Sequence, residues 1–152
     1  MIESAKRIAV RVLDALGELE WLPIFIARLS VGLEFFESGR GKIFKLDELG
    51  NYFADLGIPL PHLNALVVSW TELVAGFCLI LGFLSRIVAL PLAIIMMVAI
   101  FTAHIQKVKT VGDFFYLPEV LLLVLLVWLV FSGPGKLSID HLIARRLEYK
   151  RG

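Results

Sequence analysis

The stretch LNALVVSWTELVAGFCLILG, residues 63–82, decides the fold class of this chain. Glu72 is its one charged side chain, and the stretch is long enough to cross the roughly 30 Å hydrocarbon core of a bilayer as a helix. Two similar stretches follow, IVALPLAIIMMVAIFTAHI at residues 87–105 and FFYLPEVLLLVLLVWLVF at residues 114–131. The sequence therefore predicts at least three transmembrane helices.

A fourth span is predicted at residues 21–44, although this stretch is less apolar than the others. We interpret it as a span because residues 22–36 are otherwise apolar and need a nonpolar neighbour. An even number of spans also places both terminal tails on one side of the membrane. The charged residues of this stretch are Arg28, Glu34, Glu37, Arg40 and Lys42.

The composition agrees with a membrane protein that has almost no soluble part. Of 152 residues, 59% are hydrophobic and only 19% are charged, and the mean hydropathy is +0.84. Ordinary soluble domains are about 45–50% apolar. No linker divides the chain, so residues 1–152 are expected to form a single domain. A net charge of +1 gives no indication of a nucleic-acid partner, which would require a clustered basic surface.

Two kinds of redox or metal chemistry are excluded by the sequence. Cys78 is the one cysteine, so paired-thiol chemistry of the vitamin-K epoxide reductase kind is ruled out. Because no His/Cys cluster has metal-ligand spacing, we expect no bound metal. A cleavable signal peptide is not expected either, since acidic residues interrupt residues 1–20.

Two amphipathic segments are predicted to lie in the membrane interface. Residues 2–19 carry apolar and charged side chains on opposite helical faces, which is typical of an interfacial helix or of one docked on a soluble partner. A second apolar stripe runs through residues 46–56 and ends at Gly57. The predicted fold class is therefore all-α: an integral membrane four-helix bundle with an N-terminal amphipathic interfacial helix and a short interfacial helix in the first loop.

The basic residues predict the orientation, because cytoplasmic loops carry an excess of Lys and Arg. Nine lie on the side of the two tails and the second loop, namely Lys6, Arg7, Arg11, Arg86, Lys136, Arg145, Arg146, Lys150 and Arg151. Five lie on the opposite side, namely Arg40, Lys42, Lys45, Lys107 and Lys109. Both termini are therefore expected to be cytoplasmic.

Ionisable groups inside the spans are the candidate site residues, because such groups are costly in hydrocarbon and usually functional. With a rise of 1.5 Å per residue, Arg28 lies about 10 Å in from the cytoplasmic side. The remaining groups are expected to share the outer half of the membrane, namely Glu34, Glu37, Glu72, Glu119 and His104. They are candidates for binding a ligand or protons.

Helical phase predicts where one of these groups points. Glu72 shares a face with Ala65, Ser69 and Gly76, and small residues mark close helix contacts in membranes. The side chains of Ser30, Glu34, Glu37 and Gly41 likewise share one face of the first helix. In the alternative interpretation these carboxyls only hydrogen-bond between helices, which contributes about 0.6 kcal/mol each. Arg28 would then pair with a carboxylate or extend to the headgroups.

An ordered series of short motifs resembles the DoxX family of small bacterial membrane proteins, from about residue 28 to residue 142. The motifs are Arg28, Gly32, Gly39 and Gly41-Lys42; Leu56-Gly57-Ile58-Pro59-Leu60-Pro61; Glu72-Leu73; Leu81-Gly82 with Arg86; Pro91-Leu92 with Met97; Thr102-Ala103-His104; Gly133-Pro134-Gly135; and Ser138-Ile139-Asp140. The resemblance implies a four-helix bundle in the bacterial inner membrane and a link to redox work. A related type forms part of a thiosulfate:quinone oxidoreductase, and others are implicated in oxidative-stress complexes or lie beside genes for copper-handling peptides. Lys42 becomes a candidate site residue through this match.

Three functions remain open at this stage. The first is an accessory or quinone-facing subunit of a redox or stress-response complex, with quinone as the possible cofactor. The second is a membrane protein that binds or transports a small molecule or lipid, and the third is an anchor for a soluble partner. The expected partners are membrane lipid and a protein partner or second copy, with no nucleic acid.

Overall fold

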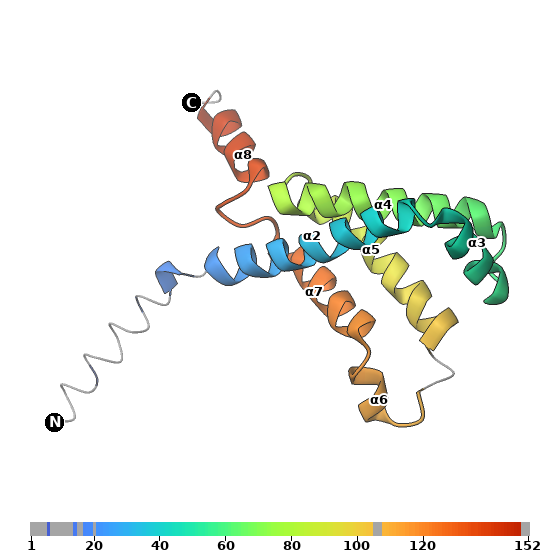
Figure 1. Cartoon of the computed structure of the whole chain (residues 1–152). Coiled ribbons are helices and arrows are strands. Elements are labelled where there is room, and N and C mark those ends of the chain that lie inside the picture. The colour runs from blue at the N-terminus through green and yellow to red at the C-terminus, as the bar shows by residue number, and fades with distance from the viewer. Residues whose placement is uncertain (1–5, 7–13, 15–16, 20, 105–107, 150–152) are drawn as a thin grey trace.

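The computed structural model describes residues 6, 14, 17–19, 21–104 and 108–149, and these ranges contain helices and no strand (Figure 1). The elements are α2 (Trp21–Ile43), α3 (Leu46–Asp55), α4 (Pro61–Leu81), α5 (Ser85–Ala99), the π-helix η1 (Ile100–His104), α6 (Val111–Phe115), α7 (Pro118–Ser132) and α8 (Ile139–Tyr149). The all-α prediction is confirmed. Most of the predicted helix at residues 2–19 lies outside the described residues.

The helices pack as two pairs. α2 lies along α4, and α5 lies along α7 on one side of that pair (Figure 1). The short helix α3 packs against the first half of α4, and α8 projects from the opposite end of the molecule. Helices therefore exist at all four predicted spans and in the first loop.

Two helical stretches are long and apolar enough to cross a membrane, by length and composition: Pro61–Leu81 and Ser85–Ala103. Only 33% and 28% of their most apolar windows are buried inside the protein, so most of these side chains face outward. The outward residues are large and apolar, such as Trp70 and Phe77 on α4 and Leu90 and Ile94 on α5. A soluble core helix would be mostly buried, whereas lipid suits this arrangement.

The fourth predicted span differs from expectation. The expected continuous helix at residues 114–131 is interrupted, because α6 ends at Phe115 and α7 begins at Pro118. Leu117 is extended, as a residue that precedes proline tends to be. The apolar helix α7 is consequently 15 residues long, shorter than α4.

The third span changes its helical geometry near its end. α5 ends at Ala99 and continues as the π-helix η1, where the Thr102 hydroxyl donates to the carbonyl of Val98 at 2.8 Å. π-Helical turns are rare and occur frequently at functional sites. The sequence reasoning did not predict this segment.

Glycines let α2 and α4 approach backbone to backbone. A Cβ added to Gly32 would meet the amide nitrogen of Ile80 at 2.9 Å, and one at Gly76 would meet the amide nitrogen of Phe36 at 2.5 Å. A Cβ at Gly39 would overlap the backbone of Leu73. Because no side chain separates the two helices here, their relative position is set by their backbones.

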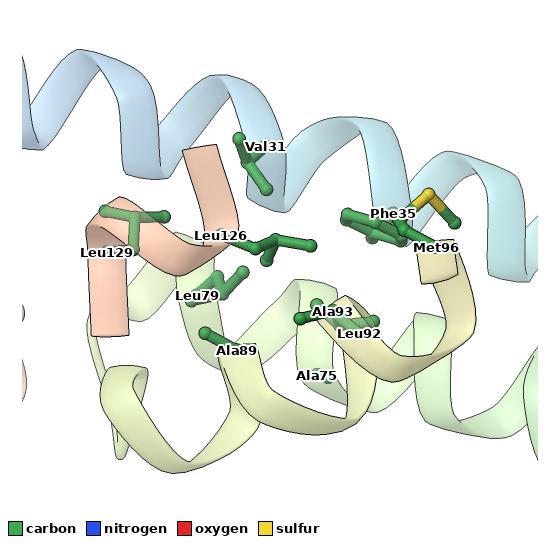
Figure 2. Packing of buried hydrophobic residues seen from close by; sticks show 10 residues of the cluster. All are labelled: Val31, Phe35, Ala75, Leu79, Ala89, Leu92, Ala93, Met96, Leu126 and Leu129. Atoms are coloured by element: carbon green, nitrogen blue, oxygen red, sulfur yellow. The ribbon is translucent and has the colours of Figure 1, made fainter. Parts of the chain in front are cut away.

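The apolar core lies where the two helix pairs meet. Val31 and Phe35 of α2 point toward Leu79 of α4 and Leu126 of α7, as Figure 2 shows. α5 contributes mainly small or flexible side chains: Ala89, Leu92, Ala93 and Met96. This core fills the middle of the bundle, so polar side chains at its two ends are separated from each other by apolar packing.

Candidate functional site

Glu72 lies in the middle of α4 and its side chain is completely buried. Ala65, Ser69 and Gly76 are buried on the same face, as the helical phase predicted. This face packs against α2, where the Ser38 hydroxyl donates to the Glu72 carboxylate at 2.9 Å. The small neighbours bring the carboxylate close to α2.

Lys42 provides the counter-charge from the last turn of α2. Its Nζ donates to both carboxylate oxygens of Glu72, at 2.6 and 2.7 Å. An unpaired charge is very costly away from water, whereas this bidentate ion pair is neutral overall. The lysine side chain is 32% exposed while the glutamate is not exposed at all, so the pair meets its surroundings through the ammonium group.

A cavity of about 490 Å³ opens beside the ion pair. Lys42 and Glu72 form part of its wall, and α3 contributes Tyr52 and Phe53. Most of the remaining wall is apolar. It comes from α3, the α3–α4 loop, α4, α5 and η1: Leu49, Leu56, Ile58, Pro59, Val68, Ile94, Ile95, Met96, Val98, Ala99 and Ala103. Asn64 and Thr102 add two polar groups. The site thus combines one charged pair with a largely apolar enclosure.

The structure does not bring Glu34 and Glu37 to this site. They share one face of α2 with Ser30 and Gly41, as predicted, but all four residues are exposed and point away from α4. Glu37 pairs instead with Arg40 at 2.5 Å. Neither carboxyl is part of the wall of the cavity beside Glu72.

Two further candidates lie elsewhere or cannot be placed. Glu119 is half-buried in the first turn of α7 and is not part of the wall of the Glu72 cavity. The backbone of His104 ends η1, but its side chain lies outside the described positions. Among the described residues, no group of three His, Cys, Asp or Glu side chains could hold a metal ion.

Arg28 lies at the opposite end of the core and is 1% exposed. Its guanidinium donates to the carbonyl of Pro134 and, at 2.6 Å, to the carbonyl of Leu137. In the part of the chain that the structure describes, its hydrogen bonds go to backbone carbonyls. The described residues show no hydrogen bond between this guanidinium and a carboxylate.

Asp140 is a structural residue that the sequence reasoning missed. Its carboxylate accepts from the backbone amides of Leu84, at 2.8 Å, and Ser85, at 3.1 Å, at the start of α5. Its own amide donates to the carbonyl of Gly82 at 3.1 Å. A carboxylate satisfies the free amides at a helix N-terminus, so Asp140 ties the start of α8 to the α4–α5 turn. The motif Ser138-Ile139-Asp140 was visible, but its partner lies more than fifty residues earlier.

The sequence profile of the DoxX family matches residues 24–105. The chain belongs to the DoxX family. This match runs from α2 through η1 and includes Arg28, Lys42 and Glu72, whereas the tail from Pro134 to Asp140 lies beyond it.

Three relatives of this DoxX protein come from bacteria, and two of them are named as membrane proteins. An uncharacterized membrane protein of Mycobacterium tuberculosis is 31% identical over 81% of this chain and 82% of its own length. An uncharacterized protein of Haemophilus influenzae is 35% identical over 80% of this chain and 83% of its own length. Inner membrane protein YqjF of Escherichia coli is 26% identical over 85% of this chain and 98% of its own length. No solved structure matches the chain.

Proposed function

We propose that this DoxX protein binds an amphipathic small molecule, with a quinone as the leading ligand, and acts as an accessory subunit of a redox or stress-response complex in the inner membrane. The observation that carries this proposal is the Lys42–Glu72 ion pair in the wall of a mostly apolar cavity of about 490 Å³. Ligand pockets for small molecules combine such an apolar lining with a few convergent polar groups.

The chemistry of the wall suits a ring with a carbonyl head and an apolar tail. The Lys42 ammonium has three donor positions and is partly exposed, so it would donate to a ligand carbonyl while it holds Glu72. Tyr52 and Phe53 of α3 offer aromatic surface to a ring, and Ile95 and Ala99 offer apolar surface to a tail. A bound quinone would supply two-electron redox chemistry, which this chain's residues do not supply.

The location of the pair argues against a purely structural role. Two helices that needed only to associate would place their polar contacts inside the glycine-lined interface, away from open space. Lys42 and Glu72 instead border a cavity whose wall is otherwise mostly apolar. We infer that Glu72 is retained because its charge holds Lys42 toward the ligand.

Ligand retention tests the proposal. The protein is purified in a mild detergent, and bound quinone and lipid are quantified by mass spectrometry in wild type, Glu72→Gln and Glu37→Gln. Glu72→Gln keeps the size of the side chain but removes its charge, so we expect roughly a tenfold loss of bound quinone, in line with one charge-assisted hydrogen bond. Glu37→Gln, an exposed acid on α2, is the matched control and retains wild-type levels.

Two outcomes would contradict the proposal. Equal quinone in all three proteins would place the binding elsewhere, and bound lipid without quinone would reject quinone as the ligand. Melting curves of the three purified proteins establish that the variants are folded.

We also propose that both termini and Arg86 face the cytoplasm. The excess of basic residues on that side supports this orientation. In a Cys78→Ala background, single cysteines at Asp47 in α3 and Arg145 in α8 are exposed to a membrane-impermeant thiol reagent in intact cells. We expect labelling at position 47 and protection at position 145. The reverse pattern would invert the orientation.

A further inference from the structure

A second hollow, of about 570 Å³, lies at the end of the bundle away from the Glu72 cavity. It is bounded by the start of α5, by the segment that follows α7, and by α8. Its lining consists of Leu84, Arg86, Ile87, Pro134, Gly135, Lys136, Asp140, His141 and Ala144. The α4–α5 turn joins the two apolar helices that are long enough to span, so the hollow lies at a membrane boundary.

The hollow has an excess of positive charge. Arg86 and Lys136 are exposed, and His141 lies beside them. Asp140 is the acidic residue of the lining, but its carboxylate already accepts from the amides of Leu84 and Ser85. The hydrogen bond from Arg86 to the carbonyl of Phe131 is 3.4 Å long, so this guanidinium keeps most of its donor capacity.

The surface next to the cations is apolar in the direction of the membrane. Arg86, Leu90 and Ile94 follow one another at four-residue spacing on the outward face of α5, and all three are exposed. Ile87, in the lining itself, is 61% exposed. A ligand bound along this stripe would meet a cation first and hydrocarbon-like surface beyond it.

α8 has a composition that fits the same boundary. Its side chains Leu142 and Ile143 are exposed, and so are Arg145 and Arg146. Exposed apolar residues alternate with arginines in helices that lie at the headgroup level of a membrane. The second hollow is therefore covered by lipid headgroups when α8 rests on the membrane.

We propose that this hollow binds the headgroup of an anionic phospholipid. The phosphodiester would lie between Arg86 and Lys136, and the acyl chains would follow Leu90 and Ile94 along α5. The proposal does not depend on the proposed function, because the polar groups that would hold the headgroup are not part of the Glu72 cavity; the acyl-chain path alone reaches Ile94, a wall residue of that cavity. We favour a lipid over free phosphate because a free anion would leave the apolar stripe without a role.

Lipid retention in native mass spectrometry tests this site. Full-length protein in detergent is titrated with phosphatidylglycerol or phosphatidylcholine, in wild type, in Arg86→Gln/Lys136→Gln and in the control Lys45→Gln/Lys109→Gln. Each basic residue near an anionic surface contributes about fivefold, so the first double variant should lose phosphatidylglycerol binding by roughly 20-fold. The control removes two exposed lysines far from the hollow and should bind as wild type does.

Three outcomes would overturn the proposal. They are equal retention of the two lipids by the wild-type protein, unchanged retention of phosphatidylglycerol in Arg86→Gln/Lys136→Gln, and its displacement by excess inorganic phosphate, which would indicate a site for free anions. If the double variant does not fold, Lys136→Gln alone replaces it, because the exposed Lys136 side chain can be changed without disturbing the core. The single variant should then lose roughly fivefold.

Discussion

Arg28 and Glu72 are both fully buried charged residues in helices of one membrane protein, yet the structure treats them differently. Arg28 is bound by backbone carbonyls of the C-terminal segment, at Pro134 and Leu137. Glu72 is bound by two side chains, Ser38 and Lys42, and borders a cavity. The first group is enclosed by its own chain, whereas the second can reach a ligand.

The difference follows from the geometry of the two groups. A guanidinium is a planar fork with donors on several edges, so it can join two carbonyls of a folded segment. The α4–α5 turn packs closely against the guanidinium, since a Cβ on Gly82 would meet Arg28 Nη1 at 2.5 Å. A carboxylate paired with a flexible lysine leaves the lysine free to donate elsewhere. Burial alone therefore does not identify a functional charge, and the space beside the charge must be considered too.

The strongest test of this comparison is Arg28→Met. We expect it to destabilise the folded protein by roughly 3–5 kcal/mol, because two charge-assisted hydrogen bonds to a fully buried guanidinium are lost. The apparent melting temperature in detergent measures the effect. Arg40→Met, an exposed arginine on the same helix, should cost less than about 1 kcal/mol. Equal melting temperatures for the two variants would contradict the role assigned to Arg28.

Gly39→Ala should disturb the close contact between α2 and α4 that positions the Glu72 site. The added methyl group would overlap the Leu73 backbone of α4, and overpacking of this kind costs about 1–3 kcal/mol. Gly41→Ala is the matched control, because a Cβ there meets nothing within 4 Å. The control should be neutral or slightly stabilising, as alanine favours helix. Melting temperatures that fall equally for both variants would show that α2 tolerates alanine poorly at either glycine, and that the close contact at Gly39 has no special role.

The smallest expected effect is the coupling between Lys42 and Glu72. Lys42→Met removes the counter-charge of the buried Glu72 carboxylate, so stability should fall by about 1–2 kcal/mol. In Lys42→Met/Glu72→Gln no charge remains, and the double variant should recover part of that loss. A double-mutant cycle on the melting data should give a coupling of about 1 kcal/mol. Strictly additive effects would mean that the ion pair contributes nothing.

Much of the fold was predictable because its signals are local. The apolar stretches predicted α4 and α5, and the stripe through residues 46–56 predicted α3, which ends at Asp55 just before Gly57. The small residues Ala65, Ser69 and Gly76 predicted correctly that Glu72 faces inward. The break before α7 could also have been predicted, because Pro118 restricts the residue before it.

The orientation of α2 could not be decided from small residues alone. Ser30 and Gly41 mark one face of this helix, and Gly32 and Gly39 mark another. The backbone of α4 packs against the second face. Glu34 and Glu37 lie on the first face and are exposed, since packing between distant helices decides which face is buried.

The contacts of the C-terminal segment could not be predicted from the sequence for a different reason. Asp140 and the α4–α5 turn are distant in sequence, and nothing local in the motif Ser138-Ile139-Asp140 indicates what it binds. Pairing over such a distance depends on the whole bundle being assembled. The Lys42–Glu72 pair was missed as a pair for the same reason, although both residues were candidates.

The order in which the chain is made gives the Arg28 contacts a consequence for assembly in the cell. The acceptors of its guanidinium lie 106 and 109 residues later in the sequence. When α2 is first made, these carbonyls have not yet been synthesised, so the Arg28 guanidinium cannot form the two hydrogen bonds that it has in the folded protein. α2 can therefore reach its final contacts only after the segment that follows α7 has been translated. A nascent chain that stops before Pro134 would leave this arginine without either acceptor.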